Sequence, residues 1–236
     1  MAKTGRTKRP LFIPDRKNIG VSEIMIEFDW HMGMSAEVRK RSVRSLHETA
    51  AKSGFGNILE ASSKSENPVG IALSAFFLKN ANGVPVENLF QSSKVFEHGG
   101  PFRDLLDKNV LPRAAKKDAR LKNSGRLLKF VFNNKEFPLE PKSLFYDWLY
   151  INVLFADQNL DLRERFLASG FDASSDIEFN PEKSINCQAR TLALCVSLYE
   201  NESVRDFVRD PVGFAREFDL YSGAYAPVNP VQSGLF

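Results

Sequence analysis

The stretch from Pro85 to Gly100 constrains the fold most, because it carries a helix pattern together with its own start and stop signals. Pro85 suits the first turn of a helix, where a missing N–H group costs little. The run Gly99-Gly100-Pro101 is typical of a helix end. At about 100° per residue one arc is almost entirely apolar, which predicts the buried face. That arc contains Val86, Leu89, Phe90, Ser93 and Phe96. We therefore predict one helix over most of this stretch.

A second stripe of this predicted helix is polar and borders the buried face. It contains Glu87, Gln91, Lys94 and His98. Two interpretations are open. The stripe is either a solvated helix edge with one Glu–Lys pair worth about 0.3 kcal/mol, or one wall of a polar cleft. Spacing alone does not decide between them.

Length and composition predict a single domain with extensions at both ends. The chain has 236 residues, of which 43% are hydrophobic, and its 20 Phe residues indicate an aromatic core. We predict an α+β domain that is mostly helical with a small β element. The expected boundaries are a flexible basic arm over residues 1–10, the domain over 11–218 and an extended tail over 219–236.

Local signals predict the main elements of the domain. Ser35 is a good N-cap for a helix ending near Lys52, and Ser184 for a helix reaching Glu200. The first turn of the second helix is a natural seat for a pyrophosphate. A third helix is apolar nearly all round and is therefore expected to be buried; it spans residues 143–155. Strands are predicted over 24–30, 57–61 and 71–78, and two short helices over 202–218, broken at Pro211.

Several features that the sequence lacks predict a cytoplasmic protein. The two cysteines, Cys187 and Cys195, are about 12 Å apart on one predicted helix, too far for a disulfide, which fits a reducing compartment. No signal-peptide core and no apolar run of about 18 residues is present, so no membrane partner is expected. Zinc spacing and glycine-rich phosphate loops are absent as well. We therefore predict no metal and no cofactor.

Positive charge is concentrated in one segment. Residues 108–129 contain eight basic side chains and one acid, Asp118, for a net charge of +7, whereas the whole chain carries +3. Such a segment attracts polyanions with an affinity that falls as salt rises. The segment either contacts a nucleic-acid backbone or forms an ordinary basic surface, and the sequence favours neither interpretation. The candidate backbone contacts are Arg113, Lys116, Lys117 and Arg120.

The segment from Glu87 to Phe96 resembles the signature helix of the NADAR family, the NAD- and ADP-ribose-associated proteins. The wider chain is similar to the subgroup that is paired with DNA-modifying ADP-ribosyltransferase toxins of the Dar type. The stretches that carry this second resemblance are 58–65, 73–76, 145–152 and 176–189. In many family members Trp-Gly follows the second acidic position, and here Ile177-Glu178-Phe179-Asn180 stands there.

The resemblance implies hydrolysis of an ADP-ribosyl glycosidic bond, and in the subgroup removal of ADP-ribose from guanine in single-stranded DNA. Cleavage of a ribosyl–nitrogen bond builds positive charge at the anomeric carbon, which a carboxylate stabilises. The implied roles fall to Glu87 as that carboxylate, Asp176 as a second one, and Lys94 as proton donor or attacking amine. Candidate substrate contacts are Phe90, Gln91, Trp148, Asn180, Asn186 and Gln188.

Two other functions compete with this hypothesis. A non-catalytic reader of ADP-ribose or of modified DNA would need the N-terminus of the helix after Ser184 and the basic segment, but not Glu87. An N-glycosidase acting on a small metabolite would not depend on the charges of residues 108–129. The glycohydrolase hypothesis also implies an antitoxin that works against a DNA ADP-ribosyltransferase toxin.

Overall fold

The computed structural model describes residues 4–221 and shows a mixed α+β architecture. A four-stranded sheet has the order β2-β1-β7-β3, and a three-stranded sheet has the order β4-β5-β6. The strands are β1 (Thr4–Pro14), β2 (Val21–His31), β3 (Ile58–Glu60), β4 (Lys94–Phe96), β5 (Leu127–Phe132), β6 (Lys135–Phe137) and β7 (Ala173–Ser175). The β component is thus larger than the small element that the sequence predicts.

Ten α-helices and two short 3-10 turns surround these sheets within the described residues. The helices are α1 (Ala36–Ala51), α2 (Pro68–Ala72), α3 (Val86–Ser92), α4 (Pro112–Lys116), α5 (Arg120–Asn123), α6 (Leu144–Leu154), α7 (Leu160–Ala168), α8 (Gln188–Glu200), α9 (Val204–Arg209) and α10 (Pro211–Glu217). The 3-10 turns are Arg103–Leu106 and Asp157–Asn159. None of the helices between residues 4 and 221 has the length and apolar character needed to cross a membrane.

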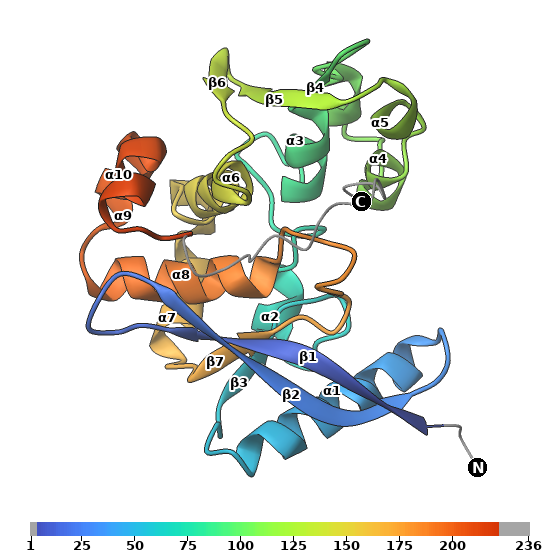
Figure 1. Ribbon diagram of the computed structural model, residues 1–236, viewed down its shortest axis with the longest axis vertical. Coiled ribbons are helices and arrows are strands. Elements are labelled where there is room, and N and C mark those ends of the chain that lie inside the picture. The colour runs from blue at the N-terminus through green and yellow to red at the C-terminus, as the bar shows by residue number, and fades with distance from the viewer. Residues whose placement is uncertain (1–3, 222–236) are drawn as a thin grey trace.

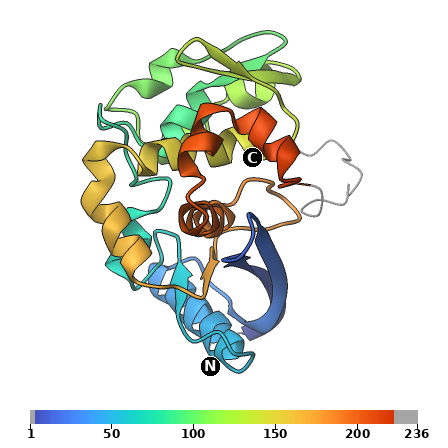
Figure 2. The same cartoon turned by 90° about the vertical axis from the view of Figure 1, so that its left-hand side faces the viewer.

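Helix α8 lies at the centre of the molecule. Figure 1 shows it crossing the middle, with the β1–β2 hairpin below it and α3 and α6 above it. Figure 2 gives the same layering from the side, with α8 viewed along its axis. Helix α6 is buried nearly all round, as predicted, and a buried ion pair fixes it to α8: Arg190 Nη1 donates to Asp147 Oδ2 at 2.7 Å.

The long β1–β2 hairpin corrects the expected N-terminal arm. Thr4–Pro10 belongs to β1, which pairs with β2 along its whole length, from Thr4 opposite His31 to Pro14 opposite Val21. Arg6 and Lys8 alternate outward on one face of the strand, so the exposed positive charge hides the strand when only composition is considered. Residues 1–3, and residues 222–236 of the predicted tail, lie outside the described part of the chain.

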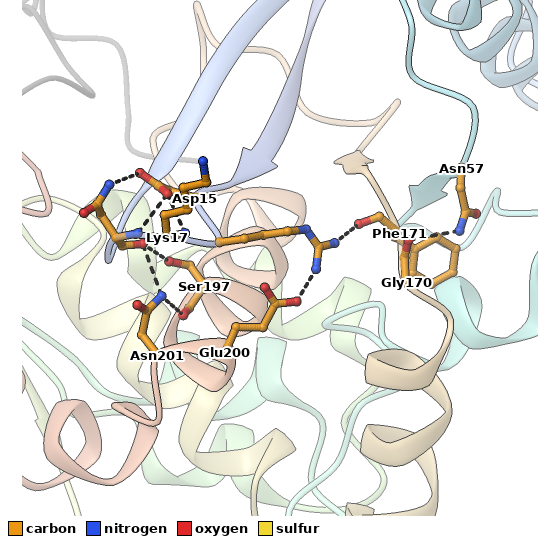
Figure 3. Close-up of polar contacts among 10 residues, drawn as sticks. Asp15, Lys17, Asn57, Gly170, Phe171, Ser197, Glu200 and Asn201 are labelled. Atoms are coloured by element: carbon orange, nitrogen blue, oxygen red, sulfur yellow. Dashed lines mark hydrogen bonds and ion pairs between the residues drawn. The ribbon is translucent and has the colours of Figure 1, made fainter.

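The turn of this hairpin is tied to the end of α8. The Arg16 guanidinium pairs with Glu200 and donates a hydrogen bond to the Phe171 carbonyl oxygen at 2.8 Å. The Gly20 N–H donates to Ser197 Oγ at 3.0 Å. Figure 3 shows Glu200, Phe171 and Ser197 converging on the turn. These contacts fix the turn of the N-terminal hairpin to the C-terminal end of α8.

Three predictions about individual elements are wrong: the type of one element and the bounds of two helices. Ile71–Leu78 is not a strand, because Asn67 caps the helix α2 by accepting from the Val69 N–H at 2.9 Å, and a turn follows. The helix predicted from Pro85 onward ends at Ser92, because the next residues pair with β5 as strand β4. Helix α8 begins at Gln188 instead of after Ser184. The helix capped by Ser35 is confirmed, since Ser35 Oγ accepts from the Val38 N–H.

Candidate active site

Helix α3 carries a buried carboxylate that is bonded within the helix. Glu87 and Gln91 are each 5% exposed, and Gln91 Nε2 donates to Glu87 Oε1 at 2.8 Å. The four-residue spacing places both side chains on one side of the helix. The neighbouring Asn88 anchors α3 by donating from Nδ2 to the carbonyl oxygens of Leu105 and Val110, both at 2.9 Å. The part of the polar stripe that lies on α3 is therefore buried and is not a solvated edge.

Lys94 joins this group from strand β4, not from the helix. Its side chain is buried, and Nζ lies 4.8 Å from the centroid of the Phe90 ring. Burial lowers the pKa of Lys94 to about 8, an effect that the negative charge of Glu87 opposes and the positive charge of Lys116 reinforces. His98, predicted on the same stripe, is exposed in the turn after β4.

Lys116 extends the cluster to the surface. It ends helix α4, and its Nζ lies 3.9 Å from Glu87 Oε1 and 5.7 Å from the centroid of the Phe76 ring. Its side chain is 46% exposed, so the buried carboxylate has a cationic partner that reaches solvent. The sequence treats Lys116 only as a backbone contact, whereas the structure places it against Glu87.

Asp176 is connected to α3 by a chain of hydrogen bonds. Gln188 Nε2 donates to Asp176 Oδ2 at 3.0 Å, and Gln188 Oε1 accepts from the Ala75 N–H at 2.7 Å. The Ala75 carbonyl oxygen in turn accepts from the Glu87 N–H at 2.9 Å. Burial raises the pKa of Asp176, while Gln188 and the charge of Lys116 lower it. Segments around residues 75, 87, 176 and 188 thus meet in one place.

The structure separates the remaining substrate candidates. Phe90 lies beside Lys94 in a stack with Phe130 and Phe145. Trp148 is instead part of the aromatic core: its ring centroid is 4.5 Å from that of Phe137, and its indole N–H donates to the Val208 carbonyl oxygen.

The two asparagines expected to contact substrate lie in the loop before α8. Asn180 Oδ1 accepts from the Glu182 N–H at 3.0 Å and so shapes a turn. Asn186 is half-buried two residues before α8 begins. Of the predicted polar contacts in this region, Gln188 is therefore the one that bonds to Asp176.

The predicted backbone contacts also differ from one another. Arg113 and Lys117 are exposed on and just after α4. The Arg120 guanidinium is held by two carboxylates, with Nη2 at 2.6 Å from Asp104 Oδ2 and 2.8 Å from Asp118 Oδ2. Because its charge is already matched, Arg120 is less available to a polyanion than its neighbours.

Two buried residues near the cluster are absent from the sequence-based candidates. Tyr146 packs edge-on against Phe90 with centroids 5.2 Å apart, and burial and the charges of Glu87 and Asp176 raise its pKa. Glu60 ends β3 and accepts hydrogen bonds from the residues on either side of Asp176. A lone acid in the apolar strand 57–61 is the signal that could have identified Glu60.

No group of three or more His, Cys, Asp or Glu side chains between residues 4 and 221 is arranged to hold a metal ion. Both cysteines are free and buried. The cluster instead offers two carboxyl groups, two amines and two amides within one small region. That set can stabilise positive charge, move protons and supply a nucleophile.

Comparisons with known proteins agree with the resemblance noted in the sequence. A family model described as the DarT1-associated NADAR antitoxin matches residues 7–225. No curated protein matches the chain. The match spans nearly the whole sequence and includes every element that contributes to the cluster. The chain therefore belongs to the family of DarT1-associated NADAR antitoxins, which are named for their pairing with a DarT toxin.

Proposed function

We propose that this protein is an ADP-ribosyl glycohydrolase that removes ADP-ribose from guanine bases in DNA and so reverses the action of a DNA ADP-ribosyltransferase toxin. The observation that carries the proposal is the cluster of buried Glu87, Lys94 and Asp176 with the partly exposed Lys116 beside Glu87, in a chain of an antitoxin family. Few soluble-domain cores bury this many ionisable groups together unless they serve a site.

In the first route, water is the nucleophile. The bond between the anomeric carbon and the guanine nitrogen breaks, and its electron pair goes to guanine. Glu87 stabilises the positive charge on the sugar, and charged Lys94 gives guanine a proton. Water bonds to the anomeric carbon and passes a proton to Asp176, whose raised pKa suits a base. The products are ADP-ribose and unmodified guanine.

In the second route, the neutral amine of Lys94 attacks the anomeric carbon. A carbon–nitrogen bond forms as the bond to guanine breaks, and the proton lost by the amine goes to guanine. Water then displaces the lysine and frees ADP-ribose. A group with a pKa of about 8 is neutral in roughly one molecule in ten at pH 7, against about one in 3,000 for an ordinary lysine. Burial therefore makes this route available.

The two routes differ in what a reductant can trap. In the second route the sugar–lysine adduct opens to an imine, which sodium cyanoborohydride reduces to a stable secondary amine. Peptide mapping should then find ADP-ribose attached at Lys94, and Lys94→Met should abolish it. Turnover with no adduct on any lysine would favour water as the nucleophile.

Exposed cations beside the cluster support a nucleic-acid substrate. Arg113 and Lys117 flank Lys116 on the outer side of α4, within the segment of net charge +7. A DNA strand that places its modified base at Glu87 would pass these side chains with its phosphates. Binding should then weaken as salt rises.

The decisive experiment follows the loss of ADP-ribosyl-guanine from a single-stranded oligonucleotide by mass spectrometry. Wild type should release ADP-ribose, Glu87→Gln should lose most turnover, and Glu97→Gln should retain it. Glu97 is a suitable control because it is exposed and pairs with Arg126. Binding without turnover by wild type would instead indicate a reader, and neither binding nor turnover would leave a small-metabolite N-glycosidase.

A further inference from the structure

The buried carboxyl group of Glu60 fixes the chain on both sides of Asp176. Glu60 is 2% exposed at the end of β3. Its Oε2 contacts Ser175 Oγ at 2.6 Å, and its Oε1 accepts from the Ile177 N–H at 2.9 Å. Both contacts span more than a hundred residues of sequence. Asp176 lies between the two bonded residues, so its backbone has little freedom to move.

The surroundings of Glu60 hold it equally firmly. Strands β3 and β7 lie side by side in Figure 1 and pair in parallel, with Glu60 opposite Ser175. The Ala61 N–H donates to the Ser175 carbonyl oxygen at 2.7 Å. Helix α2 approaches so closely that a Cβ atom at Gly70 would lie 2.1 Å from the Glu60 carbonyl oxygen. Glu60 is thus a fixed point from which Asp176 is positioned.

A hydrogen-bonded chain continues from Glu60 toward helix α1. Ser175 Oγ lies 2.9 Å from Nε2 of His47. Burial lowers the pKa of His47 to about 4, so its imidazole is neutral at pH 7, although the nearby charge of Glu66 opposes this. The Ser175 hydroxyl donates to Glu60 Oε2, and its oxygen can accept a proton from Nε2 of the neutral His47 ring. Glu60 is therefore joined to helix α1 by a chain of hydrogen bonds.

The charges around the pair determine which carboxyl group ionises first. Burial and the proximity of Asp176 raise the pKa of Glu60, although the hydrogen bonds from Ile177, Ser175 and Ser62 oppose this, and two buried carboxylates this close oppose each other's ionisation. The Glu178 N–H and Gln188 donate to Asp176, and Lys116 attracts it, whereas the Glu178 carboxylate opposes its charge. Because Asp176 has a cation as well as hydrogen-bond donors to stabilise its charge, it ionises more readily than Glu60.

We propose that Glu60 is a positioning residue for Asp176: its carboxyl group, bonded to the Ser175 hydroxyl and to the Ile177 N–H, holds the Asp176 carboxylate beside Gln188. This inference rests on the proposed glycohydrolase function, in which Asp176 accepts a proton from water. Glu60 itself touches neither substrate nor water in this scheme.

Two substitutions separate this role from a merely structural one. Gln keeps the size of Glu60 and a contact to both neighbours: its oxygen can accept from the Ile177 N–H, and its amide can donate to Ser175 Oγ, whose hydroxyl then donates to His47 Nε2. Met fills the same volume without them. Glu60→Gln should keep kcat within about threefold at pH 7 and remove an alkaline fall in kcat that follows Glu60 ionisation. Glu60→Met should lower kcat by on the order of tenfold to a hundredfold with little change in KM.

A double-mutant cycle tests whether Glu60 acts through Asp176. In an Asp176→Asn background, Glu60→Met should cost less than about twofold more, because the group that it positions is already disabled. Independent, multiplicative losses would overturn the proposal. So would a Glu60→Gln variant as impaired as Glu60→Met, because the negative charge of Glu60 would then be what matters.

A measurement without turnover keeps the proposal testable if the glycohydrolase function fails. Carbon-detected NMR of the Asp176 carboxyl group should show two titration steps in wild type, one from Asp176 and one from Glu60. Glu60→Gln should remove the step at higher pH and leave the other. Unchanged titration of Asp176 in that variant would refute coupling between the two residues, whatever the enzymatic result.

Discussion

Replacing Lys94 by Met should stabilise the folded protein while abolishing the proposed reaction. The pKa of Lys94 falls from 10.5 to about 8 on folding because the ammonium group is buried. At about 1.4 kcal/mol per pKa unit, carrying that charge lowers the free energy of unfolding at pH 7 by roughly 3 kcal/mol. Met has similar length and no charge. Glu87 keeps Lys116 as a partner, but the contact with Phe90 is weakened, so we expect a gain of roughly 1 to 3 kcal/mol.

The sign of this effect fixes its pH dependence. Below pH 8 both the folded and the unfolded chain hold the Lys94 proton, and the burial cost is fully present. Between the folded pKa near 8 and the unfolded value of 10.5, the unfolded chain binds more protons than the folded one, so wild-type stability rises with pH. The advantage of Lys94→Met should therefore shrink over that interval and vanish above it.

Urea denaturation, followed by tryptophan fluorescence at pH 7 and pH 9.5, measures the free energy of unfolding and so tests both predictions. Lys52→Met is the matched control, because Lys52 is exposed at the end of α1, and it should change stability little at either pH. A Lys94→Met variant that is less stable than wild type at pH 7, or whose advantage is the same at both pH values, would refute the reasoning.

Two further predictions follow from contacts around the site. Gly100→Ala should cost more than about 2 kcal/mol, since its Cβ would lie 2.2 Å from the Lys94 carbonyl oxygen at a φ of 87°. Gly83→Ala, at a φ of 77° in open space, should cost only about 1 kcal/mol in the same denaturation assay. Lys117→Gln should reduce the salt dependence of oligonucleotide binding by about one phosphate contact. Arg120→Gln should reduce it less, because two carboxylates already match the Arg120 charge; equal slopes would contradict this.

Local sequence signals predicted the elements that depend on local interactions. Ser35 caps α1 through a bond to a residue three positions later, and α6 is apolar on all sides, so both were predictable. Local signals do not predict strand β1, because its hydrogen bonds come from β2 and its exposed basic side chains suggest an arm. They predict a helix at Lys94, because nothing local reveals its pairing with Phe130 in β5.

The residues of the candidate site likewise divide into those that local sequence predicts and those that it does not. The segment 87–94 contains Glu87, Gln91 and Lys94, which the structure keeps together although the helix ends between them. Glu60 reaches Asp176 only through contacts across more than a hundred residues, which no local pattern encodes. Lys116 was grouped with a basic segment by counting charges. Counting could not show that its Nζ faces a buried carboxylate.

The parallel pairing of β3 with β7 also determines when the four-stranded sheet can form as the protein is made. Glu60 and Ser175 are hydrogen-bonded although they are 115 residues apart in sequence. Strand β7 lies between β3 and the β1–β2 hairpin in the sheet. At about 5–20 residues per second of synthesis, the hairpin leaves the ribosome on the order of ten seconds before β7. During that interval β1 and β3 present unpaired edges that chaperones can cover. The four-stranded sheet, and with it the position of Asp176, is therefore completed only after synthesis has passed residue 175 of the 236 residues.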